Sequence, residues 1–72
     1  MEEIAITTEF IRLDSLLKLT GLVDTGGQGK LLIQQGQVLV NGEVCSQRGK
    51  KLYPGDQVRL GDRSFQVTRA EG

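Results

Sequence analysis

The amino-acid sequence predicts an α+β domain in which two packed helices are followed by a small antiparallel sheet. Three observations favour this class. Apolar residues recur at helical spacing over residues 13–36, apolar and polar residues alternate in short runs over residues 38–69, and turn sequences separate those runs. Because the chain has only 72 residues, its core is thin, and a deep cleft for a substrate and a cofactor is not expected.

The N-terminal part of the chain predicts an edge strand and a first helix. Residues 4–8, IAITT, alternate between apolar and polar side chains, as a short strand does. A helix then begins at Leu13, and Gly21 ends it. Its buried face is expected to hold Leu13, Leu16, Leu17 and either Leu19 or Thr20.

The second helix lies within LVDTGGQGKLLIQQG. Asp24 or Thr25 can cap its first turn, and Gly36 stands where a helix ends in the left-handed conformation. Gly29 lowers helix propensity by about 1 kcal/mol relative to Ala, so we expect the two helices to approach closely there. The face that packs on the first helix is formed by Gly29, Leu32, Ile33 and Gly36.

Two hairpins make up the rest of the predicted fold. Asn41-Gly42 joins residues 38–40 to residues 43–45 through the residues that a type I′ turn prefers. Residues 53–56, YPGD, have the pattern of a type II turn. Residues 57–60 and 64–69 form the second hairpin, with Val58, Leu60, Phe65 and Val67 facing inward.

The composition argues against catalysis and against a metal centre. The chain has no histidine and one cysteine, so it lacks the commonest general base, a zinc site and an internal disulfide. Cys45 is expected to be a small buried hydrophobe. TGGQGK is superficially similar to a phosphate-binding loop, but Leu31 follows its lysine and the spacing differs. We expect no enzyme activity, no cofactor and no bound metal.

Nothing in the chain indicates a membrane protein. No run of about 20 apolar residues occurs, and the acidic N-terminus MEEI lacks the basic start of a secretory signal. A cytoplasmic, monomeric protein is expected.

The neutral net charge conceals an asymmetry. Residues 1–47 carry three cationic side chains against six carboxylates, a net charge of −3, whereas residues 48–72 carry six against three, a net charge of +3. Arg48, Lys50 and Lys51 stand together directly behind the first hairpin. A dipolar small protein can present such a basic face to a polyanion while remaining neutral overall.

Four motifs occur in the order of a known family. Arg12-Leu13-Asp14 opens the first helix, and Ile33, Gly36 and Val38 follow the pattern Ile-x-x-Gly-x-Val. Val-Asn-Gly at 40–42 and Pro-Gly-Asp at 54–56 complete the set. With these motifs the chain resembles the S-four RNA-binding domain, also called the alpha-L motif, over about residues 12–60, and it is similar to small stand-alone members of the YaaA/YbcJ type. A single domain over residues 1–72 is expected.

The resemblance implies binding of structured RNA, ribosomal, ribosome-associated or tRNA-like, and no catalysis. The sequence departs from the family where the second helix opens, because Thr25-Gly26 stands in place of the usual Ser-Arg, and Gly29 in place of the usual Ala. Part of the RNA surface must therefore be supplied differently, or binding is weaker.

The candidate RNA-binding side chains are cationic or amide groups on the loop and on the helices. Long cationic side chains suit an A-form backbone, which proteins recognise by shape, phosphates and ribose hydroxyls. Further hydrogen-bond donors are expected from Gln28, Gln37 and the free amides of residues 26–28. The candidates are Arg12, Lys30, Gln34, Arg48, Lys50 and Lys51.

Several residues also have purely structural interpretations. Arg12 can pair with Asp14 or Glu9 instead of RNA, and Asn41 is most simply a turn residue. Tyr53 could stack on a base, but packing in its turn beside Pro54 is the expected role. Because aromatic residues are not interleaved with basic ones, single-strand binding by base stacking is not expected.

Two other classes of function fit parts of the sequence. VLVNGEV followed by PGDQV is also found in β-grasp sulfur carriers, but these end in Gly-Gly, whereas this chain ends Ala70-Glu71-Gly72. A protein-interaction module that uses the basic loop is the third hypothesis.

Overall fold

The computed structural model describes residues 1–70, and it confirms the predicted α+β class. The elements follow one another along the chain as β1 (Glu2–Ile6), β2 (Ile11–Arg12), α1 (Leu13–Leu19), α2 (Gly26–Gln34), β3 (Val38–Val40), β4 (Glu43–Val44), β5 (Lys51–Leu52), β6 (Gln57–Leu60) and β7 (Arg63–Arg69).

Five strands form the main sheet, in the order β1-β7-β6-β3-β4. The part that follows the helices is antiparallel, as predicted. The edge strand β1 joins it in parallel, with Ile4 opposite Val67, so the whole sheet is mixed. A parallel neighbour needs a long crossover, and here the chain between β1 and β7 contains both helices and the rest of the sheet.

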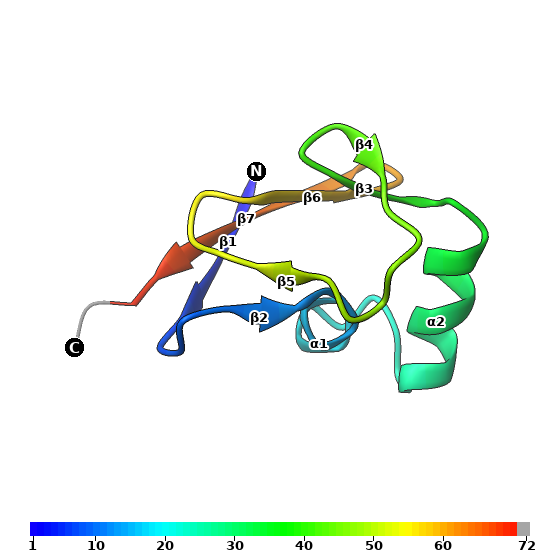
Figure 1. The fold of residues 1–72 in the computed structure, drawn as a ribbon, viewed down its shortest axis with the longest axis horizontal. Helices are drawn as coiled ribbons and strands as arrows, with labels where there is room; N and C mark the ends of the chain where they lie inside the picture. Colours follow the sequence, from blue (N-terminus) through cyan, green and yellow to red (C-terminus); the bar gives the residue numbers. More distant parts are fainter. Residues whose placement is uncertain (71–72) are drawn as a thin grey trace.

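A second, two-stranded sheet was not predicted from the sequence. Ile11 pairs with Leu52 and Arg12 with Lys51, which joins β2 to β5 in antiparallel fashion. In Figure 1 this ladder lies beneath the main sheet beside α1, while α2 closes one end of the molecule. The ladder thereby brings the start of α1 to the end of the β4–β5 loop.

Helix α1 has the predicted bounds. Leu13, Leu16 and Leu17 are completely buried. Leu19 is 61% exposed, whereas Thr20 is half-buried and its hydroxyl donates to the carbonyl of Leu17 at 2.8 Å. Of the two alternatives, Thr20 therefore continues the inner face of the helix.

Helix α2 begins at the predicted cap and ends at the predicted glycine. The Thr25 hydroxyl accepts from the Gln28 amide, and Gly36 has φ +73°. Gly29 is buried, but a Cβ there would lie 3.7 Å from Val23 Cγ2 and 4.0 Å from Leu17 Cδ1. These are ordinary van der Waals distances, so the expected close backbone approach is wrong.

The core lies between the main sheet and the elements beneath it. Both predicted hairpins form, with positive φ at Asn41 and Gly42 in the first turn. Cys45 is buried as a free thiol, as predicted. The core side chains are Ile6, Leu13, Leu16, Leu17, Val23, Ile33, Val38, Val40, Cys45, Leu52, Val58 and Val67, with Phe65 also buried.

Candidate nucleic-acid interface

The β4–β5 loop is fixed to the start of α1 through its backbone. The Leu13 amide donates to the Lys50 carbonyl at 3.0 Å, and the Asp14 amide donates to the Arg48 carbonyl at 3.0 Å. Amides in the first turn of a helix have no partner within the helix, so the loop supplies the acceptors that α1 needs. The side chains of Arg48 and Lys50 remain exposed. A loop whose backbone is tied to α1 therefore presents exposed cationic side chains.

Arg12 lies against this loop. Its guanidinium atoms are 3.6–4.0 Å from the position that a Cβ would take on Gly49, and it makes an ion pair with Asp14 at 3.1 Å. Of the two acidic partners considered from the sequence, Asp14 is the one it contacts. The Arg12 side chain is still 52% exposed, so the ion pair does not hide it from a ligand.

Lys51 completes the group. It pairs with Arg12 in the β2–β5 ladder, and its Nζ lies 4.9 Å from the centre of the Phe10 ring. We call Arg12, Arg48, Lys50 and Lys51 the basic loop surface. The sequence predicted its members, and the ladder, the two backbone hydrogen bonds and the contact with Gly49 show that Arg12 belongs with the other three.

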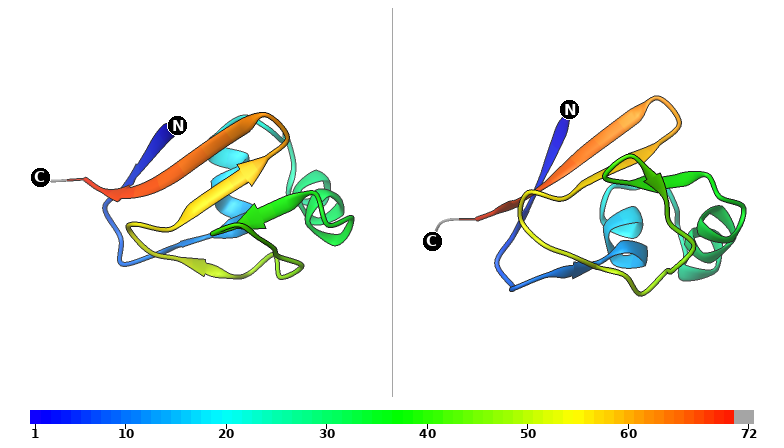
Figure 2. Two further views of the ribbon diagram at one scale, coloured as in Figure 1. Left: turned by 90° about the horizontal axis from the view of Figure 1, so that it is seen from above. Right: turned by 45° about the horizontal axis from the view of Figure 1, so that its top comes forward.

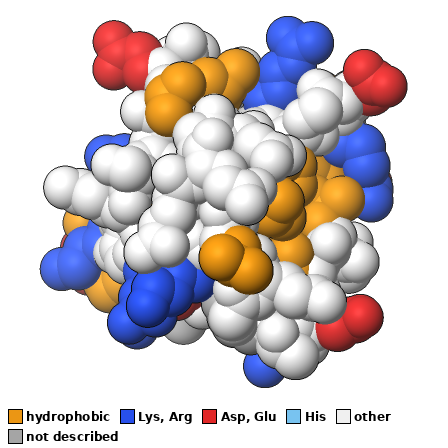
Figure 3. Space-filling model, turned by 90° about the vertical axis from the view of Figure 1, so that its right-hand side faces the viewer, with side chains coloured by type: hydrophobic (Ala, Val, Ile, Leu, Met, Phe, Trp, Pro, Cys, Tyr) orange, Lys and Arg blue, Asp and Glu red, His pale blue; other side chains and the backbone are white. Residues whose placement is uncertain are grey.

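Lys30 and Gln34 lie on a different element. Both are exposed on α2, one turn apart. Figures 1 and 2 show α2 and the β4–β5 loop at the same end of the molecule. Seen from that end in Figure 3, the central surface is mostly uncharged, and both cationic and acidic side chains lie around its rim. The two residues can thus extend a surface that the loop begins.

Other donors predicted at the start of α2 are engaged locally. The Gln28 amide donates to Thr25 Oγ1 at 3.3 Å, and the Gln28 side chain accepts from the Asp24 amide at 2.7 Å. Gln37 donates to Gln35 at 2.8 Å. The prediction of a free amide at Gln28 is therefore wrong, and the turn before α2 is held by its own side chains.

Asn41 does more than the sequence indicated. It adopts the positive φ of the turn, 52°, and its side chain also donates to Asp56 and accepts from the Gln57 amide. The sequence contained a signal for this contact in the two family motifs Val-Asn-Gly and Pro-Gly-Asp. The Asp56 carboxylate of the second motif lies beside the Asn41 side-chain amide of the first.

The described residues show no metal site and no membrane-spanning helix. Across residues 1–70, no three His, Cys, Asp or Glu side chains gather in a way that could hold a metal ion. No helix within the same residues has the length and apolar character needed to cross a bilayer.

The domain has two packed helices, a mixed sheet, and a β4–β5 loop that is tied to the start of α1. This arrangement is of the alpha-L class. The family of S4 domains matches residues 4–68, so the chain belongs to the S4 domain family. The matched region extends beyond residues 12–60 on both sides.

The chain is similar in sequence to proteins whose names refer to the ribosome or to RNA. The probable ribosome maturation protein RlbA of Bacillus subtilis (strain 168) is 46% identical over 65 residues, which cover 89% of this chain and 92% of RlbA. The putative RNA-binding protein YbcJ of Escherichia coli (strain K12) is 39% identical over 57 residues, 79% of this chain and 81% of YbcJ. The small ribosomal subunit protein uS4 of Anaeromyxobacter sp. (strain K) is 36% identical over 59 residues, 82% of this chain but 28% of uS4.

A solved structure shares the fold. The solution structure of YbcJ from E. coli, described as revealing an alpha-L motif involved in RNA binding, matches with a TM-score of 0.66 and 33% identity. The match covers 93% of this chain and 84% of that one. Because the chain has the alpha-L fold, the β-grasp sulfur-carrier hypothesis is wrong.

Proposed function

We propose that this protein binds structured RNA by its backbone through the basic loop surface, with Lys30 and Gln34 of α2 as further contacts. The observation that carries the proposal is the pair of hydrogen bonds from Leu13 and Asp14 to the carbonyls of Lys50 and Arg48, both at 3.0 Å. They hold the loop in one conformation before any ligand arrives.

The mechanism is electrostatic docking on a preformed RNA shape. The four cations of the basic loop surface lie on a rigid backbone, so binding does not have to order the loop, and the entropy loss of association is smaller. Gly49 lies between Arg48 and Lys50 and carries no side chain, so the Arg12 guanidinium can lie against the loop at this point and can contact the same phosphate as the loop cations. Contacts of this kind position a protein on an A-form helix without reading its sequence.

The biological target that fits best is ribosomal RNA, or a tRNA-like structure, in the cytoplasm. The names of RlbA and uS4 support a ribosomal setting, and the names of both YbcJ matches support RNA as the ligand. The protein is proposed to act as a monomer and without catalysis, as a binding module whose contacts are cationic and amide side chains.

The salt dependence of binding tests this proposal. Neutralising four phosphates gives a slope of log K against log salt of about −3.6, or roughly a hundredfold loss of affinity between about 50 and 200 mM salt. The measurement is a titration of a ribosomal RNA hairpin with the purified protein over this range. A flat salt response, or no binding at the lowest salt, would overturn the proposal.

A further inference from the structure

Two aromatic side chains far apart in the sequence, Phe10 and Tyr53, lie together beyond the end of the β2–β5 ladder. Because Ile11 pairs with Leu52, Phe10, which precedes β2, lies opposite Tyr53, which follows β5. The two ring centroids are 6.0 Å apart, with the planes inclined by 50°. Lys51 reaches over the Phe10 ring at 4.9 Å. We call Phe10, Lys51 and Tyr53 the aromatic corner.

The backbone of this corner is held on both sides. The Tyr53 amide donates to the Asp56 carboxylate at 2.8 Å, and the Asp56 amide donates back to the Tyr53 carbonyl at 2.9 Å. In the connection between β1 and β2, the Thr8 hydroxyl donates to the Phe10 carbonyl at 2.8 Å. An aromatic ring on such a fixed backbone loses little conformational entropy when a ligand stacks on it.

Tyr53 nevertheless remains 43% exposed, although its own ring is packed against another. Phe10 is half-buried, and Lys51 already lies over its ring. The aromatic surface open to a ligand is therefore that of Tyr53. Of the two roles that the sequence left to Tyr53, turn packing does not explain this exposed surface, whereas stacking on a base would use it.

Resting on the function proposed above, we propose that Tyr53 stacks on an unpaired base next to the helical RNA segment whose phosphates lie on the basic loop surface. Lys51 belongs to both surfaces, and a strand rises about 3.3 Å per residue, so Tyr53 stands about 7 Å further along the chain. Bases inside a duplex are covered by their neighbours, whereas a bulged or looped base can reach an aromatic side chain.

The ligand class is thus an RNA helix interrupted by an unpaired nucleotide. Such a site is tolerant of sequence, because every base has a face that can stack. A surface that bound by charge alone would bind an uninterrupted RNA helix as well as one with an unpaired nucleotide. The aromatic corner instead selects the position along the RNA at which the loop cations dock.

The test uses two RNA hairpins of the same stem, one uninterrupted and one with a single bulged adenine. The wild-type protein, Tyr53→Ala and the matched control Tyr53→Phe are titrated with each, after circular dichroism has shown that all three are folded. Wild type and Tyr53→Phe are expected to prefer the bulged hairpin by about tenfold, because the bulged base stacks on the aromatic ring; this ratio corresponds to about 1.4 kcal/mol. Tyr53→Ala is expected to lose that preference and to keep its affinity for the uninterrupted hairpin.

A second readout follows the ring itself. Tyr53 is the only tyrosine and the chain has no tryptophan, so tyrosine fluorescence reports this one side chain. At saturation, the bulged hairpin is expected to quench it and the uninterrupted hairpin is not. Equal wild-type affinity for both hairpins, or an equal loss with both for Tyr53→Ala, would overturn the stacking site alone. Binding of neither hairpin by wild type would overturn the proposed function together with it.

Discussion

The side-chain amide of Asn41 donates to the carboxylate of Asp56 at 3.1 Å, and its carbonyl oxygen accepts from the Gln57 amide at 2.9 Å. The same Asp56 carboxylate accepts from the Tyr53 amide. Asn41 therefore joins the turn of the first hairpin to the turn before β6, two motifs that lie apart in the sequence. The Asp56 carboxylate thus contacts both Asn41 and the backbone of Tyr53.

Replacing Asn41 separates its conformational role from its hydrogen bonds. Asn41→Gly keeps access to positive φ but loses both side-chain bonds, so we expect unfolding free energy to fall by about 1–2 kcal/mol. The unfolding free energy of Asn41→Ala should be lower by about a further 1 kcal/mol, because alanine is strained at a φ of 52°. Urea denaturation measures both. Equal stability of the wild type and Asn41→Gly would show that the bonds contribute nothing.

Gly29 offers a substitution that should stabilise the protein. A Cβ at this position meets Val23 and Leu17 at ordinary contact distances, so Gly29→Ala is expected to raise the unfolding free energy by about 0.5–1 kcal/mol through helix propensity and unfolded-state entropy. Gly36→Ala is the matched control, because φ +73° makes alanine unfavourable there, and it should destabilise by about 1 kcal/mol. A loss of stability in Gly29→Ala would mean that the helices cannot accept the methyl group.

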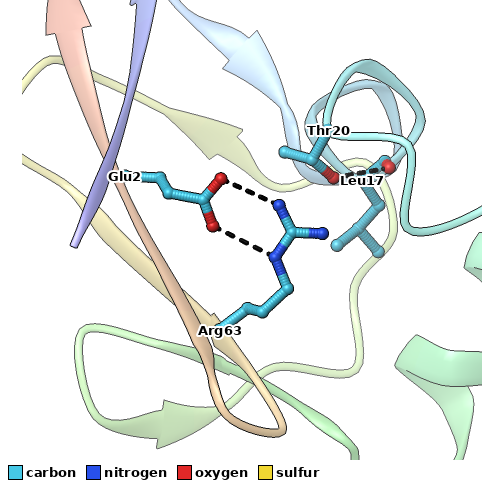
Figure 4. A network of polar contacts seen from close by, with 4 residues as sticks. All are labelled: Glu2, Leu17, Thr20 and Arg63. Carbon is cyan, nitrogen blue, oxygen red and sulfur yellow. Dashed lines mark hydrogen bonds and ion pairs between the residues drawn. The ribbon is translucent and has the colours of Figure 1, made fainter.

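Acid should weaken the ion pair between Glu2 of β1 and Arg63 of β7. Figure 4 shows the Arg63 guanidinium making two bonds to Glu2, at 2.8 and 3.0 Å, and these bonds lower the pKa of the Glu2 carboxyl from its ordinary value of 4.5. A depressed pKa contributes stability that is present above the unfolded-state value and is lost as the pH falls through the folded-state value.

The stability of the wild type should therefore fall more than that of Glu2→Gln as the pH drops below about 4.5, and the two should converge in stronger acid. Denaturation across this pH range checks the effect, which is small because both side chains are exposed. Carboxyl NMR provides the direct control, since Arg63→Gln should return the Glu2 pKa towards its ordinary value. An unchanged pKa in that variant would contradict the assigned cause.

Asp14 lies beside the basic loop surface, in an ion pair with Arg12, and opposes its charge. Asp14→Asn keeps an oxygen to accept the Ser15 amide bond but removes the ion pair with Arg12, so we expect RNA affinity to rise severalfold at low salt. The gain should shrink as salt screens the charges. Titration of the uninterrupted hairpin measures it, and a loss of affinity would show that the ion pair positions Arg12 for RNA.

The local parts of this fold could be read from the sequence because each has a short-range cause. Leu13, Leu16 and Leu17 give a helical period, and Asn41-Gly42 and Pro54-Gly55 set turns whatever the rest of the chain does. The positive charges of Arg48, Lys50 and Lys51 were likewise visible as neighbours.

The long-range parts could not be read in the same way. The β2–β5 ladder consists of two residues on each side, too few for a period of two to be recognised. The aromatic corner and the contact of Arg12 with Gly49 follow from that ladder, so both were missed with it. The parallel pairing of β1 with β7 depends on how the whole chain between them folds, and no local pattern encodes it.

The central claim is that RNA docks on the basic loop surface, and a charge reversal tests it most directly. Lys50→Glu/Lys51→Glu is compared with Arg59→Glu/Arg69→Glu, which makes the same change in net charge on exposed positions of the main sheet. At about 50 mM salt, the loop variant should lose binding to the ribosomal RNA hairpin while the sheet variant retains most of it, with both variants shown to be folded. Equal losses in the two variants would contradict the account, because net charge rather than the loop would then control binding.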